Sequence, residues 1–311
     1  MLDGASPQPD DSEGATLDLL THGPLEVEGR LVDASNATLY CTITTSQKNQ
    51  KNEKSQKSQK SQKNQKNQKN ARRQQGTVAC VYKPIAGERP LWDFPGGTLA
   101  GREVAAYAVS RAAGWDVVPP TVMRDGPFGP GMCQLWIDHD TDVDLIALSR
   151  RTDHAGLREM AVFDAVVNNA DRKIGHLLPV ADGHLYGCDH GVCFAEDYKL
   201  RTVLWQWRGK TLPRRSLEAL RRLNTQLNDG GLEAELSSLL TASEIAATKM
   251  RVETLRRLSV GLTDGWLAEE LTRHLTRAEV AATAARIDLL LTSHVHPYPP
   301  EDWPAVPWPP V

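Results

Sequence analysis

Two acidic residues, Asp171 and Asp189, stand in polar stretches whose composition suits metal and phosphate binding. Asp171 follows an apolar helical run and lies in the sequence Asn-Asn-Ala-Asp-Arg-Lys. Asp189 comes after a short apolar segment and directly precedes His190 and Gly191. Carboxylates are preferred ligands of Mg²⁺, while cations and backbone N–H groups bind phosphate. The stretch 163–194 therefore predicts a site for a metal ion and a phosphate.

Two further charged residues precede this stretch. Lys83 ends the β-rich run TVACVYKP, so its ammonium group points either to solvent or to a buried anion. Glu103 lies in the first turn of a helix predicted over 101–115, where a contact with the helix dipole is its simplest role. Phosphoryl transfer depends on positioning and charge neutralisation. A lysine, a glutamate and two further acidic residues follow one another along this chain. Together they can supply both the positioning and the charge neutralisation.

Composition limits the classes of protein that fit. The chain has 311 residues, of which 40% are hydrophobic, and its net charge of −3 gives no indication of nucleic-acid binding. Its longest apolar runs fall short of the roughly 18 residues that span a bilayer. The N-terminus is acidic, unlike a signal peptide. Five scattered cysteines indicate reduced, mostly buried thiols, and we expect a cytoplasmic protein.

The elements that must position these residues form an α+β pattern. We expect residues 1–16 to be disordered and 17–138 to form a β-rich lobe with one helix. Residues 139–297 read as a mostly helical lobe that carries both acidic loops. Within the first lobe, residues 48–69 have lysine at every third position and no apolar residue to bury, which predicts a disordered insertion over 46–75. Residues 298–311 form a Pro- and Trp-rich tail.

Three segments allow more than one interpretation. The lysine insertion is either a tolerated repeat expansion or a region that attracts nucleic acid or anionic lipid. The tail either packs its Trp303, Val306 and Trp308 on the protein, which we favour, or serves as a polyproline ligand. Thr241 and Thr276 each have Glu three positions later, which predicts two capping-box helix starts.

Over about residues 29–194 the sequence resembles the atypical kinases of the phosphatidylinositol 3/4-kinase-like superfamily. It is most similar to type II phosphatidylinositol 4-kinases, to HipA-type bacterial protein kinases and to a bacterial family labelled phosphatidylinositol kinase-like. The resemblance rests on YKP at 82–84, on EVAAY at 103–107 and on VPPT at 118–121. It also rests on the NADR and DHG motifs that contain the two acidic residues.

The resemblance implies a two-lobed protein-kinase-like fold that binds ATP and Mg²⁺, and it assigns roles to single residues. Lys83 would bind phosphate and Glu103 would pair with it. Asp171, with Arg172 beside it, would be catalytic, and Asp189 would be the main Mg²⁺ ligand. The strand 132–137 would be the hinge, where the backbone of Gln134, Leu135 and Trp136 would read adenine.

The sequence departs from those kinases at two places. They commonly have Asn five positions after the catalytic Asp, where this chain has His176, which is either a metal ligand, a substrate contact or a structural residue. They also have a glycine-rich phosphate loop, which Ser35, Asn36 and Ala37 replace here. Ser35 or Asn36 would then bind phosphate through a backbone N–H group or a side chain.

The function that follows is an ATP- and Mg²⁺-dependent phosphotransferase. We expect its acceptor to be a protein or a small molecule, with a lipid as a further option. Two alternatives use the same residues: a pseudokinase that regulates a partner, with His176 and the missing glycine loop marking lost transfer, and an adenylyltransferase. A nucleic-acid binder would rest on the lysine insertion alone.

Overall fold

The computed structural model describes residues 11–31, 36–45, 76–258, 299 and 304–310. By its internal contacts the chain divides into two compact units. Unit 1 comprises 1–90 and 120–136, and unit 2 comprises 91–119 and 137–311. The predicted insertion at 46–75 and the predicted helix start at Thr276 lie outside the described residues.

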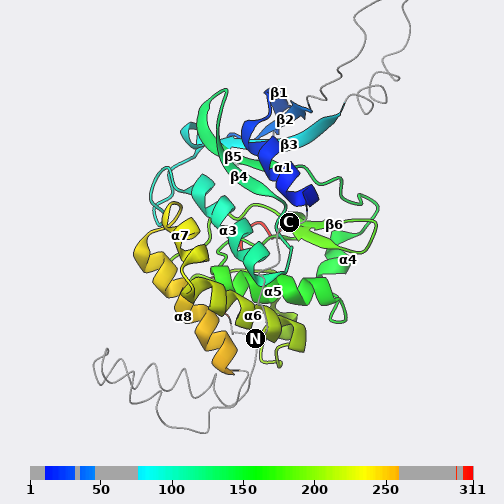
Figure 1. Ribbon diagram of the computed structural model, residues 1–311. Helices are drawn as coiled ribbons and strands as arrows, with labels where there is room; N and C mark the ends of the chain where they lie inside the picture. Colours follow the sequence, from blue (N-terminus) through cyan, green and yellow to red (C-terminus); the bar gives the residue numbers. More distant parts are fainter. Residues whose placement is uncertain (1–10, 32–35, 46–75, 259–298, 300–303, 311) are drawn as a thin grey trace, which may run out of the picture. The chain divides into compact units, whose positions relative to one another are not determined.

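Unit 1 is built on a five-stranded antiparallel sheet (Figure 1). The β-rich run TVACVYKP forms a strand, and four further strands lie within the range 17–138 that was predicted to be β-rich. Alternating apolar and polar residues explain these strands, because successive side chains point to opposite faces. The spatial order is β1 (Leu25–Arg30), β2 (Leu39–Thr44), β3 (Thr77–Pro84), β5 (Gly129–Leu135) and β4 (Thr121–Gly126).

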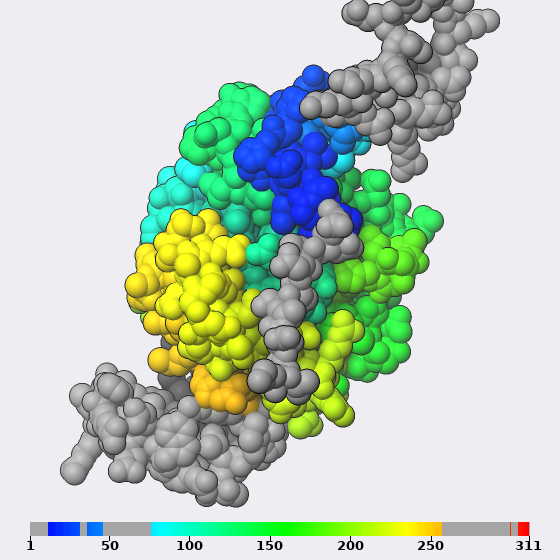
Figure 2. Space-filling model, in the orientation of Figure 1, coloured from blue at the N-terminus to red at the C-terminus, as the bar shows by residue number. Residues whose placement is uncertain are grey.

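Helix α1 (Asp11–His22) covers one face of this sheet, and it corrects the prediction of disorder for residues 11–16. Residues 11–16 are helical because α1 buries Leu20 completely in a core that includes Cys41, Cys80 and Tyr82. Its first turns are polar or small residues, which gave no helical signal in the sequence, and in Figure 2 its blue atoms lie at the surface. One buried leucine position therefore extends the folded region toward the N-terminus.

Strand alternation places Lys83 on the other face of the sheet. Tyr82 is fully buried in the core beside α1, and its neighbour Lys83 must point the opposite way. Lys83 pairs in register with Met132 of β5, so these two side chains share that second face. The pattern agrees with the prediction that Lys83 ends a buried strand.

Unit 2 is mostly helical, so the predicted α+β class is confirmed. Its two-stranded sheet pairs β6 (Leu177–Pro179) with β7 (Leu185–Gly187). The Glu103 helix, expected in the β-rich lobe, is grouped with this unit because it packs against three of the other helices. The helices are α3 (Leu99–Ala113), α4 (Leu145–Ser149), α5 (Ala155–Val167), α6 (Arg214–Asn228), α7 (Gly231–Ser237) and α8 (Ala242–Leu258).

The start of α8 confirms the first predicted capping box. The Thr241 N–H donates to Glu244 Oε2 at 2.9 Å, and the Glu244 N–H donates to Thr241 Oγ1 at 3.3 Å. The Glu244 carboxylate also forms an ion pair with the buried Arg102 of α3, which joins the two helices.

Among the described residues, no helix is both long and apolar enough to cross a bilayer. All five cysteines are free thiols, and Cys188 is the one that is not buried.

The role of α1 can be tested with Leu20→Ala. We expect the free energy of unfolding to fall by about 2–5 kcal/mol, because the change leaves a cavity in the core of the sheet. Urea unfolding followed by circular dichroism measures this loss. Leu91→Ala is the matched control, since Leu91 is 39% exposed. Equal effects of the two changes would contradict the assignment of α1 to the folded core.

Candidate active site

The short sheet of β6 and β7 brings two of the predicted site residues together. Its register pairs Leu177 with Gly187, so His176 lies opposite Cys188 and next to Asp189. The Cys188 N–H donates to the His176 carbonyl at 3.1 Å, which extends the pairing by one residue. His176 Nε2 lies 3.5 Å from Asp189 Oδ2. The hairpin therefore brings His176 and Asp189, which are thirteen residues apart in the sequence, into side-chain contact.

The loop that carries Asp171 begins where α5 ends. Asn168 caps this helix in the left-handed conformation (φ 54°) and is fully buried. Its amide donates to the carbonyls of Ala195 and Asp197 at 2.9 and 2.6 Å, and its oxygen accepts from the Lys199 N–H. The cap thus satisfies several backbone groups of the segment that follows Asp189, because buried polar groups need partners.

Asn169 orders the next turn of the same loop. Its side-chain oxygen accepts from the Asp171 N–H at 2.9 Å, and its amide donates to Asp164 Oδ1 at 3.0 Å. Asp171 is partly buried and forms an ion pair of 3.0 Å with Lys173. Burial raises the pKa of Asp171 above its ordinary value, and Lys173 opposes that rise. The result is an accessible carboxylate whose proton affinity is increased, as a general base requires.

Arg172, predicted to be catalytic, has a different role. Its side chain is fully buried, and its guanidinium group forms an ion pair of 2.8 Å with the equally buried Asp164 of α5. It also donates to the Cys188 carbonyl at 3.2 Å and lies 2.6 Å from His190 Nε2. A group with no exposed surface cannot contact a substrate. Arg172 is a positioning residue that links the Asp171 loop to the Asp189 loop.

The Asp189 loop is held from its other side by α3. The His190 N–H donates to Glu103 Oε2 at 2.8 Å, and both residues are buried. The His190 ring packs edge-on against Phe163 of α5, with centroids 5.5 Å apart. A Cβ added at Gly191 would lie 3.3 Å from Leu99, so the loop approaches α3 closely. Glu103 therefore fixes the backbone of the predicted metal loop.

Sequence reasoning missed Asp164 and His190 as parts of this site. Asp164 is the one acid in an otherwise apolar helical turn, FDAVV, and a lone carboxylate on a buried face requires a cation. That pattern was available in the sequence, but its partner Arg172 could be identified only from the fold. His190 belongs to the DHG motif, and the sequence alone gives it no role of its own.

His176 fits the role of a hydrogen-bonding partner better than that of a metal ligand. Its Nδ1 accepts from the Lys173 N–H at 3.4 Å, so its proton belongs on Nε2, which faces Asp189. A protonated Nε2 orients the carboxylate and has no lone pair for a cation. Among the described residues no three His, Cys, Asp or Glu side chains form a metal-binding group. Mg²⁺ fits Asp189 nonetheless, because it commonly takes one or two carboxylates together with substrate phosphates.

The remaining predicted residues belong to unit 1. Ser35 lies outside the described residues, whereas Asn36 Oδ1 accepts from the Arg89 N–H at 2.9 Å. The Ala37 N–H donates to the Gly87 carbonyl, so this turn is joined to the short helix η1 (Ile85–Gly87) that directly follows β3. The predicted ion pair between Lys83 and Glu103 involves both units and stays a prediction.

The predicted hinge residues end β5. The Gln134 amide donates to Thr121 Oγ1 at 2.8 Å and is buried. The Leu135 N–H donates to the Pro120 carbonyl, and the Trp136 N–H donates to the Ala79 carbonyl. Both N–H groups are therefore already used within unit 1. At Leu135 and Trp136, adenine recognition by the backbone would therefore have to use carbonyl groups.

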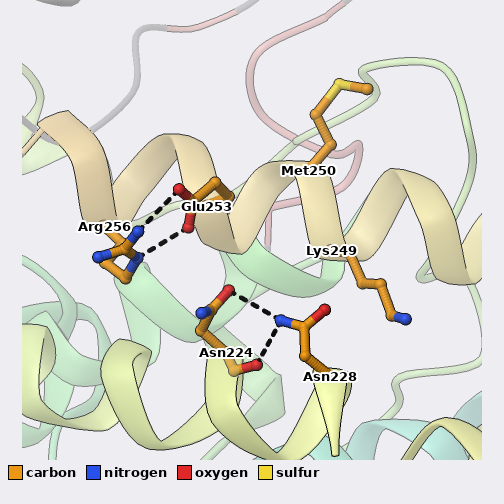
Figure 3. A pocket seen from close by; sticks show the side chains of 6 residues that line it. All are labelled: Asn224, Asn228, Lys249, Met250, Glu253 and Arg256. Carbon is orange, nitrogen blue, oxygen red and sulfur yellow. Dashed lines mark hydrogen bonds and ion pairs between the residues drawn. The ribbon is translucent and has the colours of Figure 1, made fainter. Parts of the chain in front are cut away.

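A separate surface hollow of about 420 Å³ lies between α6 and α8 (Figure 3). Its polar side chains pair with one another or with a neighbour: Asn228 donates to Asn224, Arg256 pairs with Glu253, and Lys249 pairs with Glu233. The hollow contains none of the predicted site residues. We therefore place the candidate active site at the Asp171 and Asp189 loops.

Comparison with known proteins gives an extensive sequence match. Over 267 residues the chain is 40% identical to Protein Rv2133c of Mycobacterium tuberculosis (strain ATCC 25618 / H37Rv). The match covers 75% of this chain and 86% of that protein. The chain belongs to the Rv2133c family. No protein-family model matches the sequence.

Further matches are partial in length or remote in sequence. Phosphatidylinositol 4-kinase gamma 4 of Oryza sativa subsp. japonica is 30% identical over 128 residues, which are 35% of this chain and 22% of that kinase. Hydra Fam20 with sugar covers 80% of this chain and 88% of its own, with TM-score 0.49. The Helicobacter pylori proinflammatory kinase CtkA covers 75% and 92%, with TM-score 0.42. Both structures are 11% identical, and their scores below 0.5 support no mechanistic argument.

Arg172→Met tests the buried ion pair. We expect the free energy of unfolding to fall by about 3–5 kcal/mol, because Asp164 would remain buried and unneutralised. The double variant Arg172→Met/Asp164→Leu should recover much of this loss, since it removes both charges. Urea unfolding measures all three proteins. Arg151→Met, which breaks the exposed pair with Asp153, is the control and should cause no measurable loss. A similarly small effect at Arg172 would contradict the positioning role.

Proposed function

We propose that this protein is an ATP- and Mg²⁺-dependent phosphotransferase of the atypical kinase type. The observation that carries the proposal is the buried Arg172, whose guanidinium group contacts both Asp164 and the carbonyl of Cys188. It joins the loop of Asp171 to the loop of Asp189. Arg172 thus holds Asp171 and Asp189 in fixed relative positions. Two acidic residues held in this way can take different roles in phosphoryl transfer, which depends on positioning.

Asp171 is the proposed general base. Its carboxylate is 28% exposed, so an acceptor hydroxyl can reach it, and burial raises its pKa. Asn169 holds its backbone, and Lys173 holds its side chain. Asp171 accepts the proton of the acceptor hydroxyl as the oxygen bonds to the γ-phosphorus. The bond between that phosphorus and the β–γ bridging oxygen breaks, and ADP leaves.

Asp189 is the proposed Mg²⁺ ligand, and its carboxylate is 52% exposed beside His176. A bound Mg²⁺ would neutralise phosphate charge in such a site. His176 orients the Asp189 carboxylate, and Glu103 fixes the following N–H group. Lys83 supplies a cation to the nucleotide phosphates in this proposal, with the turn at Ser35 and Asn36 as a second phosphate contact.

The acceptor in this proposal is a protein or a small molecule, with a lipid as a further option. The partial match to a phosphatidylinositol 4-kinase supports the reaction class. The match covers 22% of that kinase, which is too little to assign the substrate of that kinase to this chain.

Asp189→Ala should abolish the stabilisation by ATP that depends on Mg²⁺. At a ligand concentration of a hundred times Kd, the full chain should gain about 2.7 kcal/mol, which is read as a rise in Tm in a thermal-shift assay. Asp182→Ala is the matched control, because Asp182 is an exposed acid in the turn between β6 and β7. If Asp189→Ala keeps the Mg²⁺-dependent shift, the metal role of Asp189 is wrong.

Transfer itself is tested with γ-labelled and α-labelled ATP in separate reactions with candidate protein, small-molecule and lipid acceptors. We expect label from the γ position alone, and we expect Asp171→Asn to lower the rate by about 10²–10⁴-fold while the thermal shift with ATP persists. Transfer from the α position would identify an adenylyltransferase instead. A thermal shift without transfer of either label would favour a regulatory pseudokinase.

A further inference from the structure

The C-terminal tail, residues 304–310, contacts other segments of unit 2 through its backbone carbonyls. The Ala305 carbonyl accepts from the Thr202 N–H at 3.1 Å and from Trp205 Nε1 at 2.8 Å. The Pro310 carbonyl accepts from the Ile174 N–H at 2.9 Å. Pro307 is buried between these two attachment points. The tail is therefore attached at both ends of the described stretch.

Packing of the tail was expected, but through its tryptophans. Trp308 is 86% exposed and Val306 is 42% exposed, so the contacts of these side chains do not explain the attachment. Trp303 lies outside the described residues. Four of the seven residues in 304–310 are prolines, which restrict the chain and have no N–H group to satisfy. Such a segment can present carbonyl acceptors at a low entropic cost.

The attachment at Thr202 reaches the Asp171 loop through one intervening segment. The Arg172 N–H donates to the Arg201 carbonyl at 3.1 Å, and the Val203 N–H donates to the Arg172 carbonyl at 3.2 Å. These bonds form a parallel bridge between Arg172 and Thr202. The Thr202 hydroxyl also donates a hydrogen bond to Asp164 Oδ2 at 3.3 Å. The tail, the segment 201–203 and the Asp171 loop thus lie side by side.

The attachment at Ile174 is more direct. Ile174 begins the short helix η2 (Ile174–His176), which follows Asp171 and ends at His176, the residue that contacts Asp189. The first N–H groups of a helical turn have no acceptor within that turn. The Pro310 carbonyl supplies one for Ile174. A bond from the end of the chain therefore holds the turn that connects the two acidic loops.

We propose that the C-terminal tail is a positioning element of the active site, which holds η2 through the Pro310 carbonyl and the segment 201–203 through the Ala305 carbonyl. Its catalytic consequence rests on the proposed phosphotransferase function. Residues 304–310 contain no hydroxyl group, so this stretch cannot itself accept the phosphoryl group. The tail acts on the geometry of the loops.

The test removes the bond between Ile174 and Pro310 from either side. Truncation after Trp308 removes the acceptor, and Ile174→Pro removes the donor. Proline is tolerated at the first position of a helical turn, and Lys173 already has the extended conformation that precedes proline (φ −97°, ψ 165°). Pro310→Ala keeps the carbonyl and is the conservative variant that should restore the behaviour of the full chain.

Two quantities are measured on these proteins. Loss of one backbone hydrogen bond should speed exchange of the Ile174 amide by about three- to tenfold in the truncated chain. The kcat for phosphoryl transfer should fall by a similar factor in the truncated chain and in Ile174→Pro, with the KM for ATP unchanged. Because both changes remove the same bond, combining them should lower kcat no further than either one alone.

The outcomes separate this proposal from the proposed function. If the full chain transfers no label, the phosphotransferase proposal fails, and amide exchange alone then decides whether the tail holds η2. Unchanged exchange at Ile174 after truncation would overturn the positioning role in every case. Faster transfer after truncation would also overturn it, because the tail would then obstruct the site. Additive losses in the double variant would show that the two changes act through different contacts.

Discussion

The buried ion pair between Asp164 and Arg172 is the interaction on which the candidate site depends. Both side chains are fully inaccessible to solvent, and neither charge could be buried alone without a large free-energy cost. The pair receives further hydrogen bonds from Asn169 and Thr202, and it donates one to the Cys188 carbonyl. Each of these partners belongs to a different backbone segment. Satisfying one pair of charges therefore fixes the relative positions of three loops.

The same requirement explains why the surrounding residues are polar and yet buried. Asn168 and Glu103 use their side chains to satisfy backbone groups of the segment that includes His190 and extends to Lys199. These loops cannot form regular secondary structure over their whole length, so side chains take the place of ladder hydrogen bonds. The short pairing of β6 with β7 then needs three residues a side to place His176 against Asp189.

Local patterns predicted much of this arrangement, and tertiary burial accounts for what they missed. The alternation in TVACVYKP and the capping box at Thr241 depend on neighbouring residues, and both were found in the structure. Helix α1 was missed because its start is polar, while Leu20 and the partly buried Leu19 near its end hold it on the core of the sheet. The NADR motif, through its resemblance to a kinase catalytic loop, predicts a catalytic Arg172, and only the fold shows that Arg172 faces Asp164. The carbonyl of Pro310 has no sequence signature at all.

Three carboxylates within 26 residues of sequence acquire three environments from this arrangement. Asp164 has no exposed side-chain surface and is neutralised by Arg172, so it serves the structure. Asp171 is 28% exposed, and burial raises its pKa while Lys173 opposes that rise, which suits proton transfer. Asp189 is 52% exposed beside His176, so its oxygens can reach a cation. The three acids take different roles because they differ in burial and not in residue type. Burial decides whether a carboxylate is neutralised by a neighbouring charge or stays accessible to a ligand.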